Sequence, residues 1–176
     1  EFRSAKVLLS KNLLSCAPHE APQSELASVF FKLTLDENGV ARDRAFQSVA
    51  HAWGVSRLGH RIRANFDGAC RLLTDRVSFD DDFLLPIPYE PAVLKHGAER
   101  ATRREFIHVP AGELRLAIRS LLERNGVMAR AELEREVAAM YDGRVARRAR
   151  EWLSRVIERA LKDGLISLSE HRVELV

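Results

Sequence analysis

The sequence predicts a mainly helical protein with small β-hairpins, arranged as two similar units. Apolar residues recur at helical spacing through most of the chain. Short alternating segments, at 77–85 and 166–175, follow the last helical stretch of each half. The tripeptide Asn-Gly-Val occurs at 38–40 and again at 125–127, after the first long helical stretch of each half. The order of elements therefore repeats.

Length and composition exclude several classes of protein. A chain of 176 residues is long enough for one ordinary domain or two small ones. Hydrophobic residues make up 46% and charged residues 30%, which is typical of a soluble globular protein. Apolar runs are too short to span a membrane, and no signal peptide is visible. The first residue is Glu1 rather than methionine, so we expect the chain to be a piece of a larger protein.

Cysteine content and charge constrain the location and the partners. Cys16 and Cys70 lack Cys-x-x-Cys spacing, which favours buried thiols in a reducing compartment, here the cytoplasm. The net charge is only +3, so bulk charge does not decide whether the chain binds nucleic acid. Of the 28 cations, 23 are arginine, a bias that fits a GC-rich genome as well as phosphate recognition.

In the first half, the sequence predicts a short helix, then three longer helices and then a hairpin. The short helix is expected at 2–14, and a linker containing two prolines follows it at 16–22. Ser24 and Asp43 are expected to cap the next two helices, which Asn38-Gly39 and Gly54 end. A third helix follows Arg57, and a hairpin with the acidic tip Asp80–Asp82 closes the half. The expected elements, in order, are 2–14, 24–37, 40–41, 43–53, 57–73 and 77–85.

The second half repeats this order after a connector. Three prolines at 86, 88 and 91 predict an extended segment as far as Val109, with a basic cluster at Arg100, Arg103 and Arg104. Pro110 is expected to begin the next helix. Leu133 to Tyr141 predicts a second helix, and the arginine-rich segment from 144 leads into a third, which Gly164 ends. Ile166 to Leu175 alternates as a second hairpin.

An arginine-led helix that runs into a hairpin is typical of a winged-helix domain. We therefore predict two winged-helix-like units. The expected division is an N-terminal helix and linker (1–23), a first unit (24–88), a connector (89–109) and a second unit (110–176).

The segment Ala45–Phe66 resembles the uncharacterised domain near the C-terminus of large bacterial proteins related to superfamily-one helicases. The shared pattern is a helix ending in Gly54, a short turn, and Arg-x-Gly-x-Arg-Ile at 57–62. The resemblance covers 24–88 well and 110–176 more loosely, and it implies an accessory piece of a helicase-like protein. The chain lacks a Gly-x-x-x-x-Gly-Lys-Ser/Thr loop, so ATP binding of that kind would belong to other parts of such a protein.

The best candidates for contact with DNA are arginines of the second unit, because a guanidinium binds phosphate or guanine bidentately. We expect Arg144, Arg147 and Arg148 at the start of the third helix, together with Arg172 in the hairpin, to make these contacts. The competing interpretation is that these arginines pair with nearby acids such as Glu151 and Asp142, or cap carbonyl groups of the preceding helix. In the first unit, the acidic hairpin tip would repel phosphate, and Arg57 and Arg61 are expected to stabilise a tight turn.

No catalytic constellation, metal site or cofactor is expected. The histidines show no ligand spacing with cysteine or carboxylate, and Trp53 and Trp152 lie at core positions of their helices. The sequence thus favours a non-catalytic module that binds duplex or junction DNA. The alternative is a module for protein–protein interaction and assembly with other domains of the same parent protein. A dependence of DNA affinity on salt would separate the two.

Overall fold

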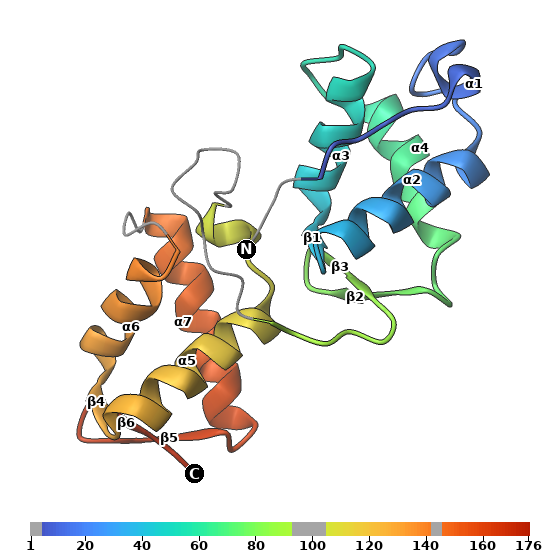
Figure 1. The fold of residues 1–176 in the computed structure, drawn as a ribbon. Coiled ribbons are helices and arrows are strands. Elements are labelled where there is room, and N and C mark those ends of the chain that lie inside the picture. Colours follow the sequence, from blue (N-terminus) through green and yellow to red (C-terminus); the bar gives the residue numbers. More distant parts are fainter. Residues whose placement is uncertain (1–4, 93–104, 142–145) are drawn as a thin grey trace. The chain divides into compact units, whose positions relative to one another are not determined.

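The structure is a computed structural model that describes residues 5–92, 105–141 and 146–176. It confirms a mainly helical fold with small antiparallel sheets. Contacts divide the chain into two compact units, one within residues 5–90 and one within residues 91–176. In each unit the long helices stand on one side of a three-stranded sheet (Figure 1).

The first unit contains four helices and three short strands. Its strand order is β1-β3-β2, with every neighbouring pair antiparallel. The predicted hairpin is confirmed, and Asp81 in its turn has a positive φ of 51°. The elements are α1 (Lys11–Leu14), α2 (Gln23–Asp36), β1 (Val40–Ala41), α3 (Arg42–Ala52), α4 (His60–Arg71), β2 (Val77–Asp80) and β3 (Phe83–Pro86).

The second unit repeats this order after a short 3-10 helix. Its strand order, β4-β6-β5, matches that of the first sheet, so the two units share one topology. The strand β4, which the sequence did not single out, takes the place of β1. The elements are η2 (Phe106–His108), α5 (Ala111–Asn125), β4 (Met128–Ala129), α6 (Arg130–Ala139), α7 (Arg147–Lys162), β5 (Ile166–Ser169) and β6 (Arg172–Leu175).

Aromatic rings fill the centre of the first core. Phe30, Phe46 and Phe66 come from α2, α3 and α4, and their ring centroids lie 5.3 to 5.5 Å apart in tilted and edge-on arrangements. Such pairs contribute roughly 0.5–1.5 kcal/mol beyond simple burial. The second core is mainly aliphatic, with Leu114, Ile118, Leu133, Val156 and Ile157 almost fully buried.

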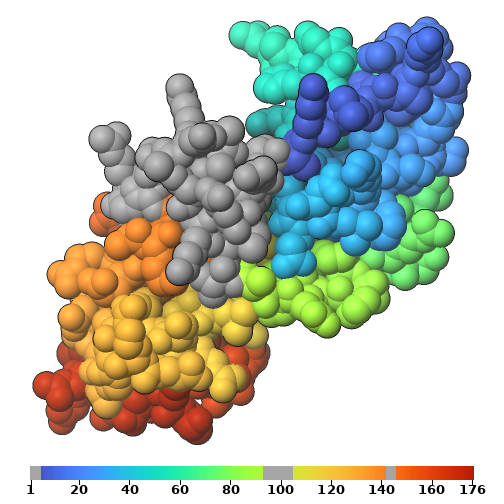
Figure 2. Space-filling view, in the orientation of Figure 1, coloured from blue at the N-terminus to red at the C-terminus, as the bar shows by residue number. Residues whose placement is uncertain are grey.

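The segment before α2 is an arm that packs on the first unit, and the predicted helix over 2–14 is wrong for most of its length. Within its described part, only Lys11–Leu14 is helical. Ala5, Val7 and Leu9 pack against the core while the residues between them are exposed. That period of two is typical of an extended segment. Of the apolar residues that suggested a helix, Leu8 and Leu14 are 70% and 53% exposed, so the apolar residues do not form one buried helical side. Figure 2 shows the arm lying on the surface of this unit.

A tryptophan holds the preceding segment in each unit. The indole N–H of Trp53 lies 3.1 Å from the carbonyl oxygen of Leu13 and 3.2 Å from that of Cys16. In the second unit, Trp152 donates to the carbonyl oxygen of Val109 at 3.0 Å. Both tryptophans therefore also fasten a segment that the sequence presented as a linker. The connector arginines at 100, 103 and 104 lie outside the described residues.

Two expected helix caps are wrong. Ser24 lies inside α2, which begins after Pro22, and Asp43 lies in the first turn of α3, after Ala41. The Asp43 carboxylate binds the Arg63 guanidinium at 2.7 Å instead of a backbone N–H. The expected helix ends are confirmed, since Gly39, Gly54 and Gly164 all have positive φ.

Candidate nucleic-acid interface

The helix α7 has one buried side and one highly charged side. Its buried side consists of Ala149, Trp152, Leu153, Val156, Ile157 and Ala160. The helix carries six cations and two acids, a net charge of +4, whereas the neighbouring α6 carries two arginines and three glutamates, a net charge of −1. Among the long helices of the second unit, the positive charge is thus concentrated on α7.

Both acids of α7 are paired with arginines. The Arg147 Nε lies 2.9 Å from Glu151 Oε1, one turn along the helix. The Arg130 guanidinium, from the start of α6, lies 2.9 Å from Glu158 and 3.0 Å from the Ser154 hydroxyl. These pairs offset the negative charge that would otherwise repel a phosphate backbone.

Arg130 also binds Glu134 on its own helix, at 3.1 Å. Burial lowers the pKa of Arg130, but hydrogen bonds and charge interactions with Glu134 and Glu158 outweigh that effect and raise it above its ordinary value. Arg130 is therefore a fixed cation that joins α6 to α7.

Three other cations form a row along α7, which we call the α7 stripe: Arg148, Arg155 and Lys162. They are spaced seven residues apart, so they lie within about 40° of one another around the helix and span roughly 21 Å along it. All three are exposed, and none forms an ion pair with a residue in the described part of the chain. The Arg155 guanidinium also lies over the Trp152 ring, 5.3 Å from its centroid.

The structure separates the arginines that the sequence grouped together. Arg144 lies outside the described residues. Arg147 is 91% exposed but paired with Glu151, as the competing interpretation expected for these arginines. Arg148 is exposed and lies about 100° around the helix from Arg147, on the side of the stripe. Arg155 and Lys162 were missed, although their seven-residue spacing from Arg148 is visible in the sequence.

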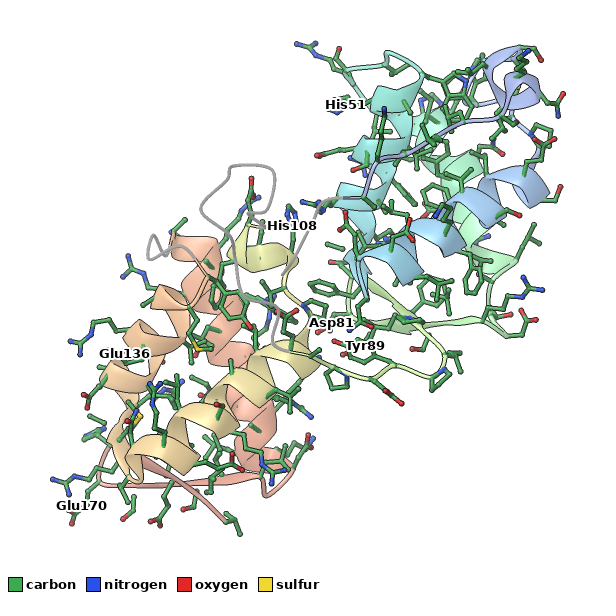
Figure 3. All side chains as sticks on the ribbon, in the orientation of Figure 1. His51, Asp81, Tyr89, His108, Glu136 and Glu170 are labelled. Atoms are coloured by element: carbon green, nitrogen blue, oxygen red, sulfur yellow. The ribbon has the colours of Figure 1, made fainter. Side chains whose placement is uncertain are left out.

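The second hairpin carries both charges. Arg172 is exposed on the central strand β6, and its cross-strand partners are Ala129 and Ser169. Two residues along, Glu174 lies on the same side of the strand and accepts a hydrogen bond from the Ser167 hydroxyl at 3.1 Å. Glu170 and His171 form the turn, and Figure 3 shows Glu170 at the end of the hairpin. Because it carries both charges, the hairpin is less suited to binding phosphate than α7 is.

In the first unit, Arg57 and Arg61 do not support the expected tight turn. Both side chains are exposed, and no ion pair joins either of them to another described residue. Gly59 between them has a φ of −70°, which any residue adopts, and a Cβ there would meet no atom within 4 Å. The predicted structural role of this Arg-x-Gly-x-Arg segment is therefore wrong, because neither the backbone nor the surroundings require it.

The remaining candidates for chemistry offer little. Both cysteines are free, and burial, reinforced by the charge of Asp67, raises the pKa of the Cys70 thiol to about 12. That thiol is therefore protonated and unreactive at neutral pH. Over the described ranges, no group of three or more His, Cys, Asp or Glu side chains could hold a metal ion, and no helix is long and apolar enough to cross a membrane.

Comparison of the chain with protein-family models, with curated proteins and with solved structures gave no match. The resemblance to the helicase-related domain stays a prediction.

Proposed function

We propose that the chain is a non-catalytic, cytoplasmic module that binds duplex DNA, and that the α7 stripe contacts the phosphate backbone. The observation that carries this proposal is the row of three exposed cations at seven-residue spacing on the most basic helix of the second unit, none of them in an ion pair with another described residue. Its length of roughly 21 Å corresponds to about six base pairs of duplex. The resemblance supports an accessory role in a helicase-related parent protein.

Contacts of this kind position a protein on DNA without reading its sequence. Arg155 is held over the Trp152 ring, so its guanidinium loses less conformational freedom on binding than a fully mobile side chain would. Arg148 and Lys162 extend the row toward the two ends of the helix. We therefore expect backbone binding with strong salt dependence and little sequence preference.

The test is to change Arg148, Arg155 and Lys162 together to Ala. Fluorescence anisotropy of a labelled duplex, measured at several salt concentrations, should show weaker binding. The plot of log affinity against log salt should flatten by about 2.7, which is roughly 0.9 for each lost phosphate contact. A thermal melt should show little change in stability, because the three side chains are exposed.

A matched control removes three charges from the same unit but away from the α7 stripe: Arg119→Ala, Arg124→Ala and Arg135→Ala, all at exposed positions. This control should keep most of the salt slope. An unchanged salt slope in the variant that lacks Arg148, Arg155 and Lys162 would refute the proposal.

A second candidate function is protein–protein assembly. An open groove of about 440 Å³ lies between α5 and the ends of α7 and the second hairpin. Leu165 and Val176 line it and are 48% and 82% exposed. Little DNA binding at any salt concentration would favour assembly through this groove over DNA binding.

A further inference from the structure

The helix α4 of the first unit has an exposed cationic face of its own. Arg61 and Arg71 lie on the side of the helix opposite the buried residues Phe66 and Ala69, about 80° apart around the axis. Both arginines are exposed, and neither is paired with another described residue. Two small residues lie between them around the helix: Ala64, which is exposed, and Gly68, against which the Gln23 side chain of α2 packs.

A third exposed cation, Arg57, precedes the same helix. Counted back from the C-terminal ends of the third helices, Arg71 corresponds to Lys162 and Arg57 to Arg148. Because α4 is shorter at its N-terminus, Arg57 lies in the turn before the helix rather than on it. We call Arg57, Arg61 and Arg71 the α4 face. No ion pair in the described part of the chain uses any of them.

Several acids near the α4 face are paired with arginines, as both acids of α7 are, whereas Asp75, four residues after Arg71, is exposed. Arg42, at the start of α3, lies 3.7 Å from Asp67 on α4 and 3.0 Å from Asp82 in the hairpin turn. Asp43 binds Arg63 at 2.7 Å. Arg42 thus takes the place that Arg130 has in the second unit. From the sequence alone, the acidic hairpin tip was an argument against phosphate contact. The pairing of Asp82 with Arg42 offsets part of its negative charge.

We infer that the α4 face is a second site for the phosphate backbone, so that one chain engages a duplex through both of its units. This inference rests on the proposed function of the α7 stripe. Two linked sites bind a ligand that reaches both of them more tightly than either binds alone, because the second contact is intramolecular. A unit of about 86 residues has a radius of gyration of roughly 12 Å and covers about one turn of duplex. The contribution of the α4 face should therefore depend on duplex length.

The experiment uses the full chain with Arg57, Arg61 and Arg71 changed to Ala, and two labelled duplexes of about 10 and about 30 base pairs. On the longer duplex, the variant should bind more weakly, and its salt slope should fall by about 2.7. On the shorter duplex, which one unit fills, it should bind nearly as the unchanged chain does. The same changes to Gln, which keep more of each side chain, should give the same result if lost charge is the cause.

The control is the variant Lys6→Ala, Lys11→Ala and Lys32→Ala, which removes the same charge from exposed positions of the same unit. It should keep the salt slope on both duplexes, and an equal loss in this control would overturn the inference. Suppose that the variant lacking Arg57, Arg61 and Arg71 binds the longer duplex like the wild-type chain, while the variant lacking Arg148, Arg155 and Lys162 loses binding. That result would overturn the inference but leave the proposed function intact. If the variant lacking Arg148, Arg155 and Lys162 binds like the wild-type chain, both the inference and the proposed function are overturned.

Discussion

Arg42 and Arg130 make equivalent interactions in the two units. Each is the first residue of the second long helix, and its backbone N–H donates to the hairpin turn, at the carbonyl oxygen of Asp82 or of His171. Each guanidinium then reaches an acid on the third helix, Asp67 or Glu158. In each unit, this one arginine side chain thereby joins the second long helix to the third, next to the hairpin. These two arginines fix structure and neutralise acids, which leaves the exposed arginines available to a ligand.

We expect Arg130→Ala to lower the free energy of unfolding by roughly 1–2 kcal/mol. The change removes hydrogen bonds to Glu134, Glu158 and Ser154 from a side chain that is only 27% exposed, although solvent weakens each of them. Urea unfolding measures the loss. Arg135→Ala is the matched control on the same helix, at a side chain that is 71% exposed, and should cost under about 0.5 kcal/mol. Equal losses would contradict a joining role for Arg130.

At the scale of single elements, Gly126 and Gly59 differ in whether the backbone requires a glycine. Gly126 ends α5 with a φ of 71° and a ψ of −136°, and its N–H donates to the carbonyl oxygen of Leu122 at 2.8 Å. Side chains rarely tolerate that backbone conformation. Gly59, within the family-like motif, has an ordinary conformation and open surroundings.

Gly126→Ala should therefore lower stability by about 1–3 kcal/mol, whereas Gly59→Ala should change it by no more than about 0.5 kcal/mol. A Cβ at either position would meet no atom within 4 Å, so the difference isolates the backbone cost. Thermal or urea unfolding of the two variants measures it. A large loss at Gly59 would restore the structural role of the motif.

For the molecule as a whole, divalent ions should have little effect. Asp80, Asp81 and Asp82 are consecutive residues of a tight hairpin, and Asp82 is paired with Arg42. Calcium or magnesium at millimolar concentration should leave the melting temperature nearly unchanged. A rise that grows with metal concentration would reveal a site that the geometry of the described residues does not indicate.

The sequence by itself determined the long helices, the two hairpins and their repeated order. Those features follow from the periods of 3.6 and 2 in apolar residues and from glycines at helix ends, which are local properties of the chain. The N-terminal arm was mistaken for a helix because a short apolar run fits either period until a packing partner selects one.

Only the tertiary structure decided which arginines are available to bind. Arg130 and Glu158 are 28 residues apart, and Arg42 and Asp82 are 40 apart, so no local pattern reveals that they pair. Arg147 and Arg148 are adjacent in the sequence, yet the turn of the helix places one beside Glu151 and the other on the α7 stripe. A charge becomes available to a ligand only when the fold leaves it exposed and without an acid nearby, and that depends on contacts between distant segments.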